Sequence, residues 1–221
     1  EDDILRGAGL AFEGGWNKVK LYFMLGLPTE TEEDMKAIAH LADKIARRYY
    51  EIPKDQRNGK CQIVASTSFF IPKPFTPFQW AKQCTKEEFL DKAYQTKRAI
   101  MEQLNQKSIK YNWHEADTSV IEGALARGDR KLCDVILKVY EKGGIYDAWS
   151  EYFDNQKWMD SFEECGLDVG FYTTRERDLD EIFPWDFIDC GVTKEFFKRE
   201  WLKAQEEKIS PNCYQSCQGC G

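Results

Sequence analysis

The segment from Lys18 to Asp34, which reads KVKLYFMLGLPTETEED, constrains the fold more than any other part of the chain. It begins as an apolar strand, passes through a Gly-Leu-Pro turn and continues as a helix with acidic residues at its start. Acidic side chains stabilise the positive end of a helix dipole, so the helix start is well marked. A strand and a helix of this kind cannot bury their apolar surfaces alone, and the segment therefore predicts an α/β sheet or barrel.

Two predicted strands, residues 18–26 and 61–71, alternate between apolar and polar side chains and are joined by an amphipathic helix. Strand, helix and strand in this order predict a parallel βαβ unit with a right-handed crossover. The apolar faces would pack against helices, and the polar faces would meet on the opposite side, which is the lumen in a barrel. The polar faces carry Lys20, Tyr22, Ser66 and Ser68.

The start of the first long helix offers two capping boxes. Thr29 with Glu32 is the first, and Thr31 with Asp34 is the weaker one. In either box the two side chains satisfy backbone N–H groups that the first helical turn leaves without partners.

Three regions follow from the patterns along the chain. Residues 1–115 read as α/β, residues 116–208 as mostly helical and residues 209–221 as a cysteine-rich tail. The first region also predicts helices over 3–14 and 85–106 and a short strand over 108–114. In the second region we expect helices over 118–127, 129–142, 145–153, 156–165 and 193–207. Residues 72–80, PKPFTPFQW, predict a rigid loop that is either a connector or a functional loop.

Composition narrows the class of protein. The chain of 221 residues is 42% hydrophobic with a net charge of −7, which predicts a globular protein and does not suggest nucleic-acid binding. No apolar run is long enough to span a bilayer and no secretion signal is present, so we expect a cytoplasmic protein. The chain has no initiator methionine and opens inside a predicted helix, which we interpret as a fragment of a longer protein.

The tail holds three of the eight cysteines, Cys213, Cys217 and Cys220, in the spacing C-x3-C-x2-C. Three thiolates so close together suit a zinc ion or one face of an iron–sulfur cluster. The other interpretation is a flexible tail with free thiols, and no fourth ligand is evident. Elsewhere, Arg127 and Arg130 flank a predicted helix start, where they could bind an anion.

The sequence is similar to a known superfamily. The segment YFMLGLPTETEED resembles the fifth-strand motif of radical S-adenosylmethionine (radical SAM) enzymes. The segments FIPKPFTPFQW, SVIEGALARGDRK and GGIYDAWSEYF follow in order and resemble a subfamily of uncharacterised Fe-S oxidoreductases with a cobalamin-binding domain. The resemblance covers nearly the whole chain. It implies the C-terminal half of a partial (β/α) barrel with few parallel strands, followed by a mostly helical extension.

Two departures from the superfamily matter. The cysteine triad that holds the catalytic four-iron four-sulfur cluster follows the first barrel strand in that superfamily, and nothing like it lies near residue 1 here. The cobalamin-binding domain is also absent. The tail triad has the same spacing but follows the barrel part, so the resemblance does not make it the catalytic cluster site. We therefore expect this piece alone to be inactive.

The resemblance implies a parent enzyme that cleaves S-adenosylmethionine reductively to start radical chemistry on an unknown substrate. Its partners would be the missing N-terminal half of the barrel and the cobalamin-binding domain. A half barrel leaves an open strand edge, so we expect this piece either to pair with another copy of itself or to cover that edge with its own helices. The tail would hold an auxiliary iron–sulfur cluster or zinc. The residues expected to contact cofactor or substrate are Lys20, Tyr22, Leu25, Gly26, Leu27, Pro28, Ser66, Ser68 and Phe70.

A rival hypothesis is a non-enzymatic interaction module, an acidic α/β and helical scaffold whose tail binds zinc. It accounts for the net charge of −7 and for the thiols. It leaves the polar strand faces and the proline-rich loop unexplained. A C-x3-C-x2-C motif after a strand, encoded upstream of residue 1, would distinguish the two.

Overall fold

The computed structural model describes all 221 residues, which form two compact units. The first unit comprises Glu1–Phe70 and Glu87–His114, and the second comprises Ile71–Lys86 and Glu115–Gly221. The change from the first to the second unit after His114 lies next to the predicted change at residue 115. The proline-rich loop and the cysteine-rich tail both belong to the second unit.

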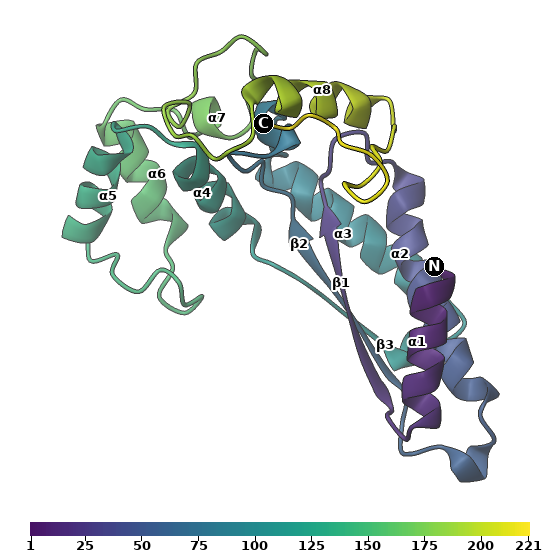
Figure 1. Cartoon of the computed structure of the whole chain (residues 1–221). Coiled ribbons are helices and arrows are strands. Elements are labelled where there is room, and N and C mark those ends of the chain that lie inside the picture. The colour runs from purple at the N-terminus through teal and green to yellow at the C-terminus, as the bar shows by residue number, and fades with distance from the viewer. The chain divides into compact units, whose positions relative to one another are not determined.

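The first unit is built on a three-stranded parallel sheet in the order β1-β2-β3 (Figure 1). With eight α-helices in the chain, the predicted α/β class is confirmed. The strands are β1 (Lys18–Leu25), β2 (Gln62–Phe69) and β3 (Ile109–Trp113), and the helices that accompany them are α1 (Asp2–Glu13), α2 (Glu32–Glu51) and α3 (Lys86–Met101). Short 3-10 helices lie at Lys54–Gln56 and Gln106–Ser108.

One face of the sheet is packed against helices. Ile63 and Ala65 of β2 are fully buried there, and the apolar side chains of α1, α2 and α3 surround them. Phe69 at the end of β2 stacks on Phe89 of α3 with ring centroids 4.4 Å apart. The strand alternation predicted from the sequence is therefore the alternation between this helix-covered face and the opposite one.

The start of α2 differs from the first of the two expected capping boxes. The N-cap residue is Thr31, whose backbone N–H and hydroxyl both bond to the Asp34 carboxylate at 2.8 Å. Thr29 has a backbone φ of +66° and lies before the cap, in the turn. The box of Thr29 with Glu32 is thus wrong, because the chain needs two more residues to turn from the strand into the helix.

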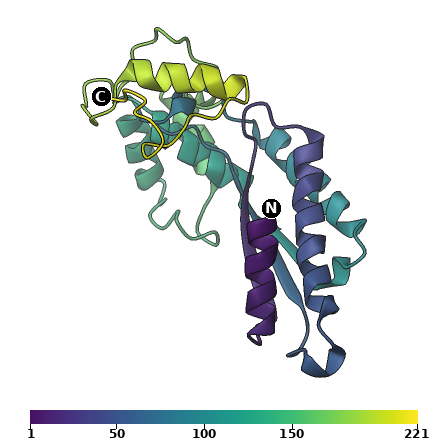
Figure 2. The same ribbon diagram turned by 45° about the vertical axis from the view of Figure 1, so that its right-hand side comes forward.

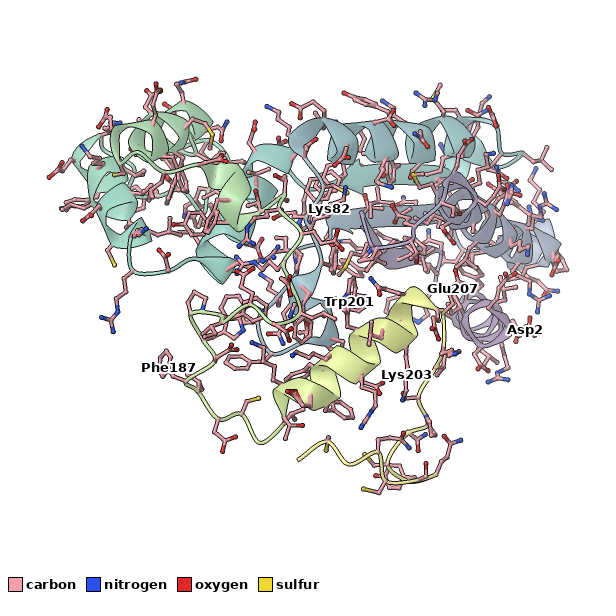
Figure 3. The ribbon with its side chains drawn as sticks, turned by 90° about the horizontal axis from the view of Figure 1, so that it is seen from above. Asp2, Lys82, Phe187, Trp201, Lys203 and Glu207 are labelled. Carbon is pink, nitrogen blue, oxygen red and sulfur yellow. The ribbon has the colours of Figure 1, made fainter.

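All the regular secondary structure of the second unit is helical, and turns and loops make up the rest. Its helices are α4 (Ala116–Arg127), α5 (Leu132–Glu141), α6 (Asn155–Glu164), α7 (Val169–Tyr172) and α8 (Lys194–Gln205), with a 3-10 helix at Pro77–Trp80. Val135, Val139 and Phe162 form part of the core between α5 and α6. Trp201 of α8 points into this unit, where its ring lies 5.7 Å from that of Phe78 (Figure 3).

The helix expected over 145–153 is wrong. This segment consists of turns, in which Trp149 N–H donates to the Tyr146 carbonyl and Tyr152 N–H to the Trp149 carbonyl, each at 2.9 Å. Bonds between residues three apart give the aromatic side chains a nearly helical spacing, which explains the wrong prediction. None of the eight α-helices combines the length and apolar character that crossing a bilayer requires.

Candidate functional site

The face of the sheet opposite the helices of the first unit is polar and accessible. Tyr22 is 73% exposed on β1, and its strand register places it beside Ser66 of β2, which in turn lies beside Asn112 of β3. Lys20 precedes Tyr22 on the same face, with its Nζ 4.7 Å from the tyrosine ring centroid. The structure therefore brings Lys20, Tyr22, Ser66 and Ser68 onto one face, and β3 adds a carboxamide that the sequence did not indicate.

The N-terminal half of this face is hollowed and basic. The hollow has a volume of about 440 Å³ and is lined in part by four lysines that form no ion pair in the structure: Lys18, Lys20, Lys107 and Lys110. In a chain with a net charge of −7, four unpaired ammonium groups around one hollow give this face a local positive potential. Of these four lysines only Lys20 was predicted. Lys18 lies at the very start of β1, Lys107 precedes β3 in a 3-10 helix, and Lys110 lies on β3, whose five residues are too few for an alternation to be assigned.

The turn after β1 is fixed by a buried carboxylate. Gly26 has a φ of +88° and donates its N–H to Oε2 of Glu30 at 2.9 Å. The same oxygen lies 2.9 Å from Nζ of Lys92 on α3, and the Glu30 side chain is 5% exposed. A glycine is required here by the left-handed backbone alone, independently of any ligand. The sequence indicated Glu30 only as a charge near the helix start.

The remaining residues expected at the strand end divide by exposure. Leu25 belongs to the helix-facing side of β1 and is completely buried, so only its backbone is available at the turn. Its carbonyl accepts the N–H of Phe70 at 2.7 Å, which joins the ends of β1 and β2. Phe70 is itself buried, Pro28 is half-buried and Leu27 is exposed.

The tail keeps its three thiols free and exposed, at Cys213, Cys217 and Cys220. No group of three or more His, Cys, Asp or Glu side chains in the structure is already arranged to hold a metal ion. The chemistry of three neighbouring thiols nevertheless fits a thiophilic metal, and exposed segments of this kind commonly gather their ligands as the metal binds.

The second unit contains a buried cationic core that sequence reasoning missed. Arg127 is 1% exposed and donates to the carbonyls of Thr173 at 3.2 Å and Gln79 at 3.5 Å, while its Nε has no partner. Burial, followed by repulsion from Arg177, lowers the pKa of Arg127 to about 9. Arg127 is thus occupied inside the unit, and its interpretation from the sequence as an anion-binding residue at the start of α5 is wrong.

One carboxylate balances much of this positive charge. Glu181 makes two bonds to the Arg175 guanidinium, at 2.7 and 2.8 Å, and a longer contact of 3.4 Å to Arg177. The hydrogen bonds from Arg175 hold the pKa of Glu181 below its ordinary value. Arg177 is also buried, with its guanidinium carbon 5.4 Å from the Phe183 ring centroid. This cluster is structural, because protein carbonyls, rings and a carboxylate surround its charges.

The chain is similar to a distant archaeal protein. An uncharacterised protein of Methanocaldococcus jannaschii is 29% identical over 167 residues, which are 76% of this chain and 34% of that protein. The chain thus spans about a third of the length of the relative that it matches. No protein-family model matches the chain, and no solved structure matches it.

Proposed function

We propose that this chain is the C-terminal half of the partial barrel of a radical SAM enzyme, and that the open sheet face lines the lumen. The observation that carries this proposal is a parallel sheet covered by helices on one face and lined with polar side chains on the other, with a glycine turn at the carboxyl end of β1. In (β/α) barrels, function is placed at this end of the strands. The matching motifs along the sequence support the same family.

The side chains on the open face suit a polar cofactor with a charged amino-acid part. Lys20 offers an unpaired ammonium group to a carboxylate, and Tyr22, Ser66 and Asn112 offer hydroxyl and amide groups to a sugar or a base. Neither β1 nor β3 contains a cysteine, and Cys61 before β2 is buried. The residues of this sheet therefore do not fit the catalytic cluster, which the missing half of the barrel would hold.

In the whole protein, S-adenosylmethionine bound beside a reduced four-iron four-sulfur cluster would supply radical chemistry on an unknown substrate. This chain's own part would be to bind and orient the cofactor along the open face and to exclude water from it. The tail would hold an auxiliary iron–sulfur cluster or zinc. The missing barrel half and a cobalamin-binding domain would be partners within the same protein, in the reducing cytoplasm.

The decisive experiment uses the whole protein encoded by the gene. We expect a C-x3-C-x2-C motif after a strand upstream of residue 1, and brown, iron-containing protein when it is prepared without oxygen. A strong reductant should then produce 5′-deoxyadenosine from S-adenosylmethionine. A whole protein that lacks the upstream motif and forms no deoxyadenosine would contradict the proposal.

A variant of Lys20 tests whether the open face is the cofactor face. In the whole protein, Lys20→Met should lower deoxyadenosine formation by at least about tenfold, because a charged hydrogen bond contributes roughly 1.5–3 kcal/mol. Lys36→Met is the matched control, since Lys36 on α2 is paired with Glu32 and Glu33 at the surface. Equal activity of the two variants would remove Lys20 from the site.

The second candidate is a non-enzymatic interaction module with a zinc-binding tail. The four unpaired lysines around the hollow favour it, because such a surface attracts an acidic partner. The same experiments distinguish the two functions. The module would contain zinc in the tail but no cluster-binding motif upstream, and it would leave S-adenosylmethionine intact.

A further inference from the structure

The C-terminal tail folds back along α8 and returns to the N-terminal end of that helix (Figures 1 and 2). Near its beginning, the Ser210 hydroxyl donates to the Glu200 carboxylate of α8 at 2.6 Å and accepts from Lys203 at 2.8 Å. Farther along, the Arg199 guanidinium donates to the Gln218 carbonyl. The tail is therefore attached to the helix at several points, although its side chains are mostly exposed.

The end of the tail meets the segment that precedes α8. Both the N–H and the hydroxyl of Thr193, the N-cap of α8, donate to the Cys220 carbonyl, at 2.8 and 3.2 Å. Gly221 lies so close to Gly191 that a Cβ on Gly221 would be 2.3 Å from the Gly191 carbonyl oxygen. Gly191 follows Cys190 directly, just as Gly221 follows Cys220. Two cysteines that are thirty positions apart in the sequence are thus brought to neighbouring backbone positions.

We propose that Cys190 is the fourth ligand of a four-thiolate metal centre whose other ligands are Cys213, Cys217 and Cys220. This inference rests on the proposal that the tail binds metal, and it supplies the ligand that the tail alone lacks. Tetrahedral zinc and a four-iron four-sulfur cluster both take four cysteines, so the same residues suit either. All four thiols are free and exposed, so they can approach one another without disrupting a packed core.

The other four cysteines are poorer candidates, and Cys84 among them is only partly exposed. Cys61 is buried in the first unit, where burial raises the pKa of its thiol to about 11 and disfavours the thiolate that a metal requires. Cys133 is exposed on α5, and Cys165 follows the end of α6 as its C-cap. No hydrogen bond of the tail reaches either segment, whereas the Thr193 bonds hold the tail beside Cys190.

The test uses the 221-residue chain with its thiols reduced. Zinc affinity is measured by competition with a coloured chelator, and cobalt is added separately because thiolate-to-cobalt absorption reports the number of sulfur ligands. A third arm supplies iron and sulfide without oxygen and distinguishes a cluster from zinc. The variants are Cys190→Ser, Cys220→Ser and, as the matched exposed control, Cys133→Ser.

We expect one metal site per wild-type chain and an unchanged site in Cys133→Ser. Cys190→Ser should weaken zinc binding by at least about tenfold, since even residues that only support a ligand cost 10–100-fold when lost. Its cobalt absorption should fall by about a quarter, because one thiolate of four is gone. Cys220→Ser should show the same losses. Because Cys190 is exposed, the urea midpoint of its metal-free serine variant should equal that of the wild type.

The two ways of failing are distinguishable. If Cys190→Ser binds zinc and cobalt as the wild type does while Cys220→Ser does not, Cys190 is not a ligand and the tail centre remains. If the wild-type chain binds neither metal nor cluster, the tail centre and its fourth ligand are both refuted. Neither result depends on the formation of deoxyadenosine by the whole protein, which tests the radical SAM proposal separately.

Discussion

Gly26 gives the turn after β1 a backbone conformation that other residues rarely adopt, and this turn lies at the candidate site. Its φ of +88° is unfavourable for any residue with a Cβ, and its N–H is held by the buried Glu30 carboxylate. Gly26→Ala should therefore lower the free energy of unfolding by roughly 1–2 kcal/mol. Urea denaturation followed by circular dichroism measures this loss.

Gly7→Ala provides the control for that loss. Gly7 lies inside α1, and a Cβ added to it would meet nothing within 4 Å. The substitution should stabilise the chain by up to about 1 kcal/mol, because alanine is the better helix former. Equal effects of the two substitutions would show that the turn does not need glycine.

Glu181 provides a pH-dependent test of the buried arginine core. Its pKa lies below the ordinary value of 4.5, chiefly because of the hydrogen bonds from Arg175. A lowered pKa in the folded state means that the stabilisation is present above pH 4.5 and is lost as the pH falls through the folded pKa. Glu181→Gln should cost about 2 kcal/mol at pH 7, since buried guanidinium groups then lose their charged acceptor.

The acid limb of the stability curve distinguishes this role from simple packing. Below pH 4.5 the difference between wild type and Glu181→Gln should shrink, because protonation removes the same charge from the wild type. Asp180→Asn is the control, since the Asp180 carboxylate is 91% exposed in its pair with Lys198 and its loss should leave the urea midpoint unchanged. A difference that is constant from pH 7 to pH 3 would contradict the charge argument.

At the scale of elements, two substitutions at the start of α2 test which of the two expected capping boxes forms. Thr31 is the N-cap and bonds to Asp34, so Thr31→Ala should cost about 1 kcal/mol. Thr29→Ala should change the urea midpoint little, because Thr29 lies outside the helix in a left-handed conformation that suits neither residue. A larger loss for Thr29→Ala than for Thr31→Ala would contradict the observed cap.

Strand alternation, helical spacing and helix-start residues in the sequence correctly predicted most of the helices and strands. The βαβ unit follows from strand alternation and an acidic helix start, and helices α4, α5, α6 and α8 lie where their apolar spacing placed them. The helix predicted over 145–153 was wrong because consecutive turns give the aromatic side chains a nearly helical spacing. The four-residue helix α7 was missed because one turn is too short to show a period.

The candidate site was predictable only where one strand carried it. Lys20 and Tyr22 follow from the alternation of β1, and Ser66 and Ser68 from that of β2. The neighbourhood of Cys190 and Cys220 depends on a tail that turns back over a whole helix, and no local pattern encodes such a contact.

At the scale of the whole molecule, the exposed strand edge predicts that the chain self-associates at high concentration. β1 and β3 are the outer strands of the sheet, and β1 pairs only with β2. The carbonyls of Asn17 and Leu25 accept hydrogen bonds from β2, so the backbone groups of these residues point toward β2. Successive residues of a strand direct their backbone groups to opposite edges, and the N–H of Met24 therefore points away from β2. Unpaired edges of this kind attract other strands.

We therefore expect reversible self-association through the β1 edge rather than through the open face, where the lysines of two copies would repel each other. Sedimentation velocity over a hundredfold range of concentration should show a growing dimer population. Met24→Pro removes one outward N–H and should shift the chain toward monomer, whereas Met101→Ala, at the exposed end of α3, should not. The expectation is contradicted if the wild-type chain stays monomeric at every concentration and hydrogen exchange of the outward β1 amides is rapid. The β1 edge would then be neither covered within the chain nor paired with another copy.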